Sequence, residues 1–182
     1  MPETQAIAVV DTLHGVEIVD NYRWLENGDD PGVREWGDKQ DEYCRHMLTQ
    51  YPGREKLEAR IRELMKIGTV SDPAIHGGRY FYRRRDGDMQ HSQLLLKRGL
   101  DAEPEVVIDP GTFSIDGTVA LDWWYPSPDG KMIAYGKSSS GTENSTLFII
   151  DVDAKKLLAD TIPYADAASI AWLKDNSGFY YT

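Results

Sequence analysis

Few residues of this sequence stand at the spacings that catalysis requires. A serine hydrolase usually carries its nucleophile in a Gly-x-Ser-x-Gly turn between a strand and a helix. The serines at 138–140 do not fit that pattern and lie between two predicted strands, so we interpret them as a hairpin loop. Gly77-Gly78 precedes a strand rather than forming a phosphate loop. No histidine or cysteine pair has metal-ligand spacing. The residues therefore predict no catalytic site, metal or cofactor within this chain.

Carboxylates and tryptophans are the remaining candidates for a site. Asp151 and Asp153 are interpreted as a solvated strand end rather than as a general acid and base. Trp123 and Trp124 are adjacent on a predicted strand, so their side chains point to opposite faces. We therefore expect one of them to line a pocket and the other to pack in the core.

The overall composition is that of an ordinary globular protein with an acidic surface. The 182 residues are 41% hydrophobic and 27% charged, with a net charge of -10. A net negative charge repels phosphate backbones and so disfavours nucleic-acid binding. The basic run Arg83–Arg85 does not offset this repulsion, because Asp86 and Asp88 follow it directly. A single cysteine, Cys44, is typical of a reducing compartment. No secretory leader or membrane-spanning stretch is evident, so we expect a cytoplasmic protein without a membrane partner.

The first 68 residues predict an arm followed by two helices. Asp30-Pro31 is a typical helix start, with a capping carboxylate before proline at the first helical position. Apolar residues at helical spacing continue to about Tyr51, and a second stripe runs from Pro52 to Gly68. We predict a helical hairpin at 31–68 whose apolar faces need a partner, since two helices alone bury too little surface.

Residues 69–182 change to the alternating pattern of antiparallel strands. We predict three groups of strands: 79–85, 92–98 and 105–109; 119–125, 131–138, 145–152 and 157–162; and 167–173 and 178–182. Tyr82, Tyr135 and Tyr181 end equivalent aromatic strands and recur at a spacing of about 50 residues, which is typical of propeller blades. An ordinary antiparallel sandwich is the alternative. The fold class is thus mainly β with an N-terminal helical hairpin, and 69–182 would form blades 1, 2 and the start of 3.

Short phrases along the whole chain resemble the N-terminal part of the prolyl oligopeptidase family of serine peptidases. The matching phrases include Asp20-x-Tyr22-x-Trp24-Leu25-Glu26, Arg79-Tyr80-Phe81-Tyr82, Asp116-Gly117-Thr118-Val119-Ala120-Leu121, Ser127-x-Asp129-Gly130, Ala134-Tyr135-Gly136 and Ala171-Trp172. Each phrase is weak alone, but together they occur in the family's order and spacing. One departure is Asn21, which stands where the family usually has proline.

The resemblance implies a peptidase of which this chain would be one part. In the family, the N-terminal arm packs on a C-terminal α/β-hydrolase domain, and a seven-bladed propeller covers the active site. The propeller admits only short peptides, which are cut on the carboxyl side of proline. The family's catalytic triad belongs to the hydrolase domain and maps onto no residue here. The chain alone is therefore expected to be inactive, with the hydrolase domain and short proline-containing peptides as its partners.

The resemblance also implies three substrate-binding residues on the tunnel wall. Glu143 lies in a loop where the family has an acidic group facing the peptide cavity. Asp122 and Trp123 stand where the family carries a basic residue and a glycine, so the wall would differ in charge and bulk. Residues 167–169, which open the third blade, would face the same cavity.

Two other functions remain open from the sequence. One is a non-catalytic β-propeller module that binds peptides or proteins. The other is a peptidase similar to oligopeptidase B, which cuts after basic residues and shares the early Tyr-x-Trp-Leu phrase.

Overall fold

The structure is a computed structural model that describes residues 2–166 and 168–182. The chain divides into two compact units, Met1–Arg62 and Glu63–Thr182. The boundary between the units lies inside the second helix. The division into domains at 1–68 and 69–182 stays a prediction.

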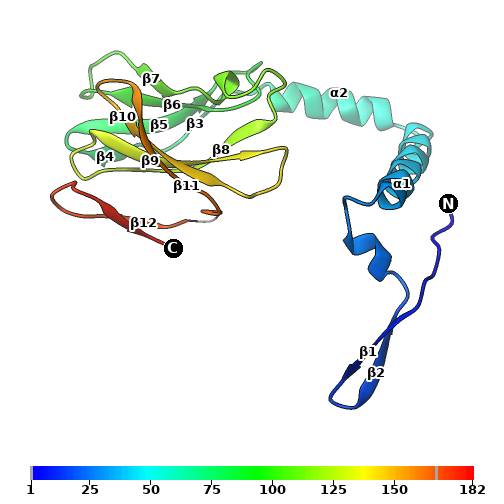
Figure 1. Cartoon of the computed structure of the whole chain (residues 1–182). Coiled ribbons are helices and arrows are strands. Elements are labelled where there is room, and N and C mark those ends of the chain that lie inside the picture. The colour runs from blue at the N-terminus through cyan, green and yellow to red at the C-terminus, as the bar shows by residue number, and fades with distance from the viewer. Residues whose placement is uncertain (1, 167) are drawn as a thin grey trace. The chain divides into compact units, whose positions relative to one another are not determined.

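The first unit begins with a β-hairpin. Strands β1 (Val9–Leu13) and β2 (Val16–Asp20) pair antiparallel (Figure 1). The two turn residues, His14 and Gly15, both have positive φ (51° and 80°), as the tight turns of two-residue hairpins require. The sequence predicts only an arm for this region, because the two strands are short and exposed.

The arm is attached to the first helix by two tryptophans. A 3-10 turn, η1 (Arg23–Glu26), carries Trp24. The Trp24 and Trp36 rings pack edge-to-face, with their centroids 6.3 Å apart. The Trp24 indole also donates a hydrogen bond to the Gln5 carbonyl (2.9 Å). Helix α1 (Pro31–Thr49) begins as predicted, with the Asp30 carboxylate accepting a hydrogen bond from the Gly32 amide at 2.7 Å.

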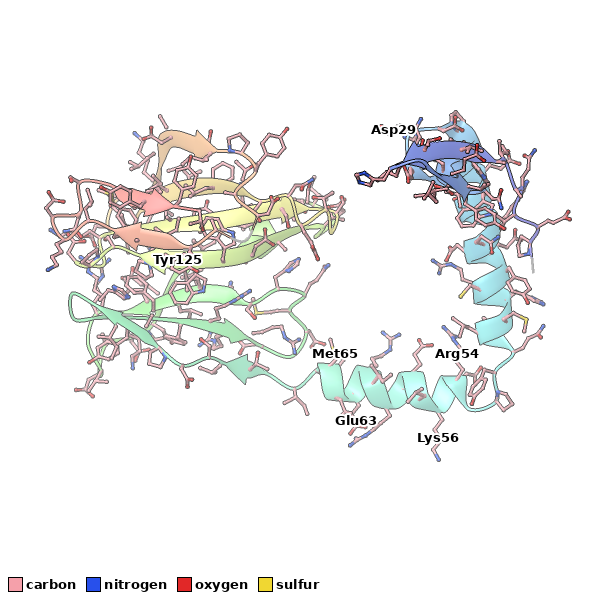
Figure 2. All side chains as sticks on the ribbon, turned by 90° about the horizontal axis from the view of Figure 1, so that it is seen from below. Asp29, Arg54, Lys56, Glu63, Met65 and Tyr125 are labelled. Carbon is pink, nitrogen blue, oxygen red and sulfur yellow. The ribbon has the colours of Figure 1, made fainter. Side chains whose placement is uncertain are left out.

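Helix α2 (Arg54–Met65) follows after a short turn, and Figure 2 labels both its end residues. The two predicted helices are therefore present. Neither buries any residue, and within the described residues they do not pack along each other as the arms of a closed hairpin would. The arm partly covers α1 around Trp36, whereas the apolar side chains of α2 and of the last turn of α1 remain exposed.

The second unit consists of antiparallel sheets, which we call blades 1, 2 and 3. Blade 1 contains β3 (Thr69–Val70), β4 (Ala74–His76), β5 (Arg79–Arg85), β6 (Gln93–Lys97) and β7 (Glu105–Ile108). After the 3-10 turn η2 (Pro110–Thr112), blade 2 is a meander of β8 (Val119–Pro126), β9 (Met132–Ser139), β10 (Thr146–Asp151) and β11 (Lys156–Ile162). Blade 3 is the pair β12 (Ile170–Trp172) and β13 (Phe179–Tyr181).

The strand groups predicted from the alternating pattern are confirmed. Tyr82, Tyr135 and Tyr181 lie on β5, β9 and β13, the strands after the tight turn that opens each repeat. Tyr181 ends its strand as predicted, whereas Tyr82 and Tyr135 lie inside theirs. The short strands β3 and β4 were not predicted, since two or three exposed residues give no alternating pattern.

Blades 1 and 2 share one apolar layer, and blades 2 and 3 share another. The first layer joins Phe81, Leu94 and Leu96 of blade 1 to Leu121, Ile133 and Tyr135 of blade 2. The second joins Leu147 and Ile149 of blade 2 to partly buried Ile170, Trp172 and Phe179 of blade 3. Alternate residues of β10 serve the two layers, because successive side chains of a strand point to opposite faces. This stacking is that of propeller blades rather than of a sandwich.

Ion pairs supplement the apolar layer between blades 1 and 2. The Asp153 carboxylate, in the turn after β10, accepts two hydrogen bonds from Arg79 of β5 (2.9 and 2.8 Å) and one from Arg98 (2.6 Å). Hydrogen bonds from the two guanidinium groups lower the pKa of Asp153 to about 2. Asp153 is therefore an anchor between blades and not simply a solvated strand end.

The helices of the described chain are too short or too polar to cross a membrane.

Candidate functional site

One cavity of the second unit brings together all three residues that the sequence analysis placed on a substrate-binding wall. The cavity encloses about 450 Å³, and we call it the β8 cavity. Its lining residues are Asp122, Trp123, Tyr125, Glu143, Ser145, Asp166 and Ala168. Asp122, Trp123 and Glu143 therefore lie around one space, although whether that space binds substrate stays a prediction.

A β-bulge in β8 directs Asp122 and Trp123 toward this cavity. Leu121 pairs with Lys137, but Trp123 pairs with the next residue back, Gly136, so Asp122 is an extra residue in the strand. Beyond the bulge the alternation is shifted by one position. Leu121 and Trp124 consequently share the layer with blade 1, whereas Trp123 packs toward blade 3. The two tryptophans thus point to opposite faces, as predicted.

The Trp123 ring is held in one position by three neighbours. Its indole N–H donates a hydrogen bond to the Ala165 carbonyl at 3.2 Å. Its ring lies so close to Gly136 that a Cβ at this glycine would stand 2.4 Å from ring carbon Cε2. The Tyr125 ring lies beside it, with ring centroids 5.9 Å apart. The cavity therefore has a fixed aromatic wall.

Three carboxylates give the cavity a negative charge. Asp122 is held by hydrogen bonds from the Ser138 hydroxyl (2.9 Å) and the Ser145 hydroxyl, and both serines are buried. Asp166 accepts a hydrogen bond from the Ser145 amide at 2.9 Å. Glu143 lies in the β9–β10 loop, exposed and with a positive φ of 60°. Throughout the described part of the chain, none of the three forms an ion pair with a lysine or arginine.

The described lining residues offer charge and aromatic surface, and none of them is a nucleophile paired with a histidine base. The Ser145 hydroxyl donates a hydrogen bond to Asp122, and no histidine is among the described residues that line the cavity. Among the residues described, no cluster of three or more histidine, cysteine or acidic side chains is placed to hold a metal ion. The side chains could hold a ligand in place by charge and stacking.

Sequence reasoning missed three residues of this cavity, namely Tyr125, Ser145 and Asp166. Tyr125 could have been found, because it lies two positions after Trp123 on the same face of a strand. Ser145 and Asp166 carried no signal, since they reach the cavity from two different loops. Ala168 belongs to the 167–169 segment that was expected to face the peptide cavity, and it lines the β8 cavity; Ala167 lies outside the described residues.

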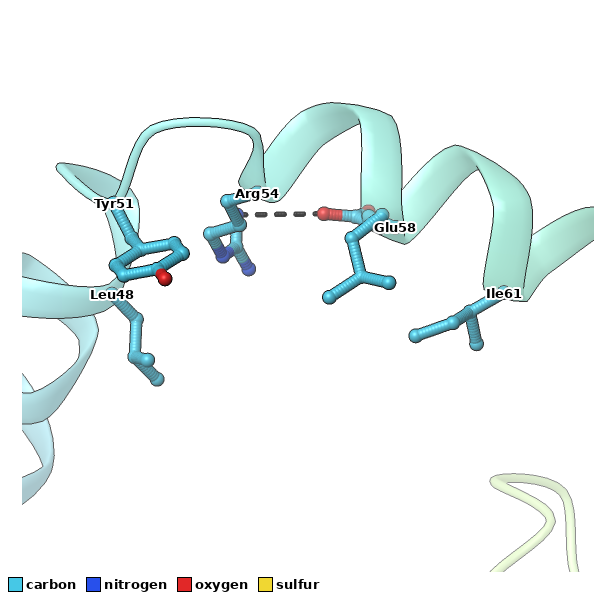
Figure 3. Close-up of a pocket in the computed structure, with 6 residues that line it drawn as sticks. Leu48, Tyr51, Arg54, Glu58 and Ile61 are labelled. Carbon is cyan, nitrogen blue, oxygen red and sulfur yellow. Dashed lines mark ion pairs between the residues drawn. The ribbon is translucent and has the colours of Figure 1, made fainter.

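A second hollow lies on the exposed apolar side of the helices in the first unit. This groove of about 490 Å³ is lined by Leu48, Tyr51, Arg54, Leu57, Glu58 and Ile61, and we call it the helix groove (Figure 3). Leu57 is 60% exposed and Tyr51 71% exposed. The ion pair between Arg54 and Glu58 (3.4 Å) is polar, but most of the lining is apolar. Such a surface is typical of a face that another protein part covers.

Comparison with known proteins agrees with this architecture. The family described as "Prolyl oligopeptidase, N-terminal beta-propeller domain" matches residues 2–182. Prolyl endopeptidase from Elizabethkingia meningoseptica is 29% identical over 181 residues, which are 100% of this chain and 25% of that protein. Prolyl oligopeptidase A from Amanita bisporigera is 28% identical over 94% of this chain and 25% of its own length. The chain thus spans about a quarter of the length of these relatives.

Solved structures show the same likeness. A chain from a structural and mechanistic study of two prolyl endopeptidases has a TM-score of 0.90 at 40% identity, covering 99% of this chain and 27% of that one. Prolyl oligopeptidase B from Galerina marginata, bound to a 35mer hydrolysis and macrocyclization substrate, has a TM-score of 0.82 at 26% identity, covering 99% and 29%. With the family match over nearly the whole chain and the stacked blades of the second unit, this chain belongs to the prolyl oligopeptidase N-terminal β-propeller domain family.

Proposed function

We propose that this chain is the N-terminal and propeller part of a serine peptidase that hydrolyses short peptides on the carboxyl side of proline. In this proposal the chemistry belongs to an α/β-hydrolase domain that these residues do not include. The blades contribute by limiting the size of peptides that reach the active site. They also shield that site from water and from bulky competitors. The protein would act in the cytoplasm.

The observation that carries the proposal is the combination of propeller blades with a cavity that can bind but not cleave. The β8 cavity has charge and aromatic surface but no nucleophile with a base. The relatives named prolyl endopeptidase are about four times longer than the stretch that this chain matches. We infer that Asp122, Trp123 and Glu143 form part of the wall along which substrate passes.

The helix groove supports a hydrolase domain as the partner of the first unit. Its apolar side chains have no cover within the unit, and covering each large one is worth about 1.5–3 kcal/mol. A domain of the same polypeptide would be present in one copy for every first unit, so it could cover this groove in every molecule. We therefore propose that the helix groove docks on the hydrolase domain.

The test compares two samples on the same substrate. One is the 182-residue chain alone, and the other is this chain joined to the remainder of its reading frame. Hydrolysis of a short proline-containing peptide should occur only in the second sample, with cleavage after proline by mass spectrometry. A folded protein that contains the same peptide sequence should be resistant. Turnover by the 182-residue chain alone would falsify this division of roles.

The same experiment separates the remaining alternatives. A reading frame with further blades and no hydrolase domain would favour a non-catalytic binding module. Cleavage after lysine or arginine, rather than after proline, would favour a peptidase similar to oligopeptidase B.

A further inference from the structure

We propose that the β8 cavity is a subsite for a cationic group of the bound peptide, either an arginine or lysine side chain or the N-terminal ammonium. The inference rests on the proposed function, since it takes a peptide as the ligand. It adds the chemistry by which one part of that peptide is recognised.

The aromatic wall is one line of evidence for a cationic ligand. Trp123 and Tyr125 present adjacent rings to the cavity, and the Trp123 indole is fixed by its bond to the Ala165 carbonyl. The faces of such rings attract ammonium and guanidinium groups, and a guanidinium also stacks on them. Because Gly136 leaves room for the indole, the ring is in place before any ligand arrives.

Uncompensated charge is an independent line of evidence. Two acidic groups elsewhere in the second unit illustrate such compensation: Asp153 pairs with Arg79 and Arg98, and Glu105 pairs with Arg98 and Lys155. At the β8 cavity three carboxylates converge, and the described residues supply no lysine or arginine to any of them. A ligand cation would provide the missing counter-charge.

The cavity also has the order and the size that a subsite needs. The Asp122 carboxylate is held by the Ser138 and Ser145 hydroxyls, so little side-chain entropy is lost when it meets a ligand. The volume of about 450 Å³ is within the range of ligand pockets, and it leaves room for an arginine side chain with part of its backbone.

Direct binding to the 182-residue chain tests the proposal. The probes are three short proline-containing peptides that differ in the cationic group they carry: an N-acetylated arginine peptide, its N-acetylated citrulline counterpart, and the citrulline peptide with a free amine. Citrulline keeps the shape of arginine without its charge. We expect a cationic probe to bind more tightly than the neutral one by calorimetry. Tighter binding of the arginine peptide would identify the side chain as the recognised group. Tighter binding of the free-amine peptide would identify the terminal ammonium.

Matched variants assign the preference to the cavity. Each of Asp122→Asn, Glu143→Gln and Asp166→Asn should weaken binding of the cationic probe about two- to fivefold, the range for exposed ion pairs. Asp160→Asn removes an exposed carboxylate of β11 outside the cavity and should change nothing. Tyr125→Leu keeps an apolar wall but removes a ring, and it too should weaken the cationic probe more than the neutral one.

Three outcomes would overturn the proposal. The first is equal affinity for all three probes. The second is a preference that survives in the three carboxylate variants. The third needs no variant: in the unaltered chain, the preference should shrink between about 20 mM and about 0.5 M salt as the Debye length falls, and a constant preference would rule out charge recognition. None of these measurements involves hydrolysis, so the subsite can fail while the peptidase proposal stands, or the reverse.

Discussion

At the scale of single residues, Asp153 connects blades 1 and 2 through three hydrogen bonds from two arginines. Its carboxylate receives both arms of Arg79 and one arm of Arg98. Arg79 is only 15% exposed, so removing its partner leaves a poorly hydrated cation behind. Asp153 itself is 44% exposed, which limits the stabilisation to the order of 1 kcal/mol.

We therefore expect Asp153→Asn to lower the free energy of unfolding by about 1–2 kcal/mol at neutral pH. The pKa of Asp153 is lowered in the folded state to about 2 from its ordinary value of 3.8. Its stabilising effect is therefore complete above about pH 4 and is lost as the pH falls toward 2. Urea unfolding measures this at pH 7 and at pH 2.5. The difference in free energy of unfolding between the chain and its variant should be smaller at pH 2.5.

The control for this prediction is Asp101→Asn, which removes an exposed carboxylate of the loop before β7. It should leave the unfolding curve unchanged at both pH values. A difference between the chain and Asp153→Asn that stays constant with pH would show that the ion pairs do not stabilise the interface.

Gly136 is a second single-residue determinant, because the Trp123 ring occupies the place of its missing side chain. We expect Gly136→Ala to destabilise the second unit by about 1–3 kcal/mol, the usual cost of overpacking. Gly178→Ala is the matched control, since the nearest atom to its Cβ would be a leucine methyl at 3.8 Å. Thermal unfolding should separate the two variants, and an equal response would mean that the indole moves aside freely.

At the scale of elements, helix α1 contains two glycines, Gly37 and Gly32, at which substitution by alanine should change stability differently. Gly37 lies in the helix interior with open space where a Cβ would be, whereas a Cβ at Gly32 would stand 3.0 Å from the capping Asp30 oxygen. We expect Gly37→Ala to stabilise the helix by about 0.5–1 kcal/mol, because alanine loses less backbone entropy than glycine.

Gly32→Ala is the comparison within the same helix. The gain in propensity should be offset there by crowding of the cap, so its effect should be smaller or reversed. Circular dichroism at 222 nm during thermal unfolding measures both variants. Equal stabilisation by the two alanines would mean that the Asp30 cap contributes little.

The β8 strand shows how an element can re-aim a functional side chain. Without the bulge at Asp122, Leu121 and Trp123 would share one face, and the indole would enter the layer between blades 1 and 2. With the bulge, that layer receives Leu121 and Trp124, and the β8 cavity receives Trp123. The cavity therefore depends on one inserted residue as much as on the types of its side chains.

At the scale of the whole molecule, the helix groove determines how the chain behaves in solution. Leu57 and Ile61 are 60% and 49% exposed on α2, and Leu48 is 53% exposed on α1. We expect the isolated chain to bind an apolar dye and to self-associate at high concentration. Leu57→Glu with Ile61→Glu should reduce both effects without lowering the melting temperature, because neither side chain is buried.

Lys56→Glu controls for the change in charge, since Lys56 does not line the groove. We expect this variant to bind the dye and to self-associate as the unaltered chain does. Fluorescence measures dye binding, and analytical ultracentrifugation measures association. If the helix groove docks on the proposed hydrolase domain, the double variant should also weaken that docking. Unaltered dye binding in Leu57→Glu with Ile61→Glu would show that the groove is not the apolar site.

The sequence alone was enough for the helices, the main strands and the blade repeat. Helical spacing and the Asp30-Pro31 start are local signals, and the alternation around Tyr82, Tyr135 and Tyr181 repeats three times. It also singled out Asp122, Trp123 and Glu143, through resemblance rather than periodicity. Only the tertiary structure decided that these three surround one cavity with Tyr125 and Asp166. The reason is physical: a bulge is a choice of register between two strands, and loops from different strands meet only after the blades have stacked, so neither appears in the order of residues along the chain.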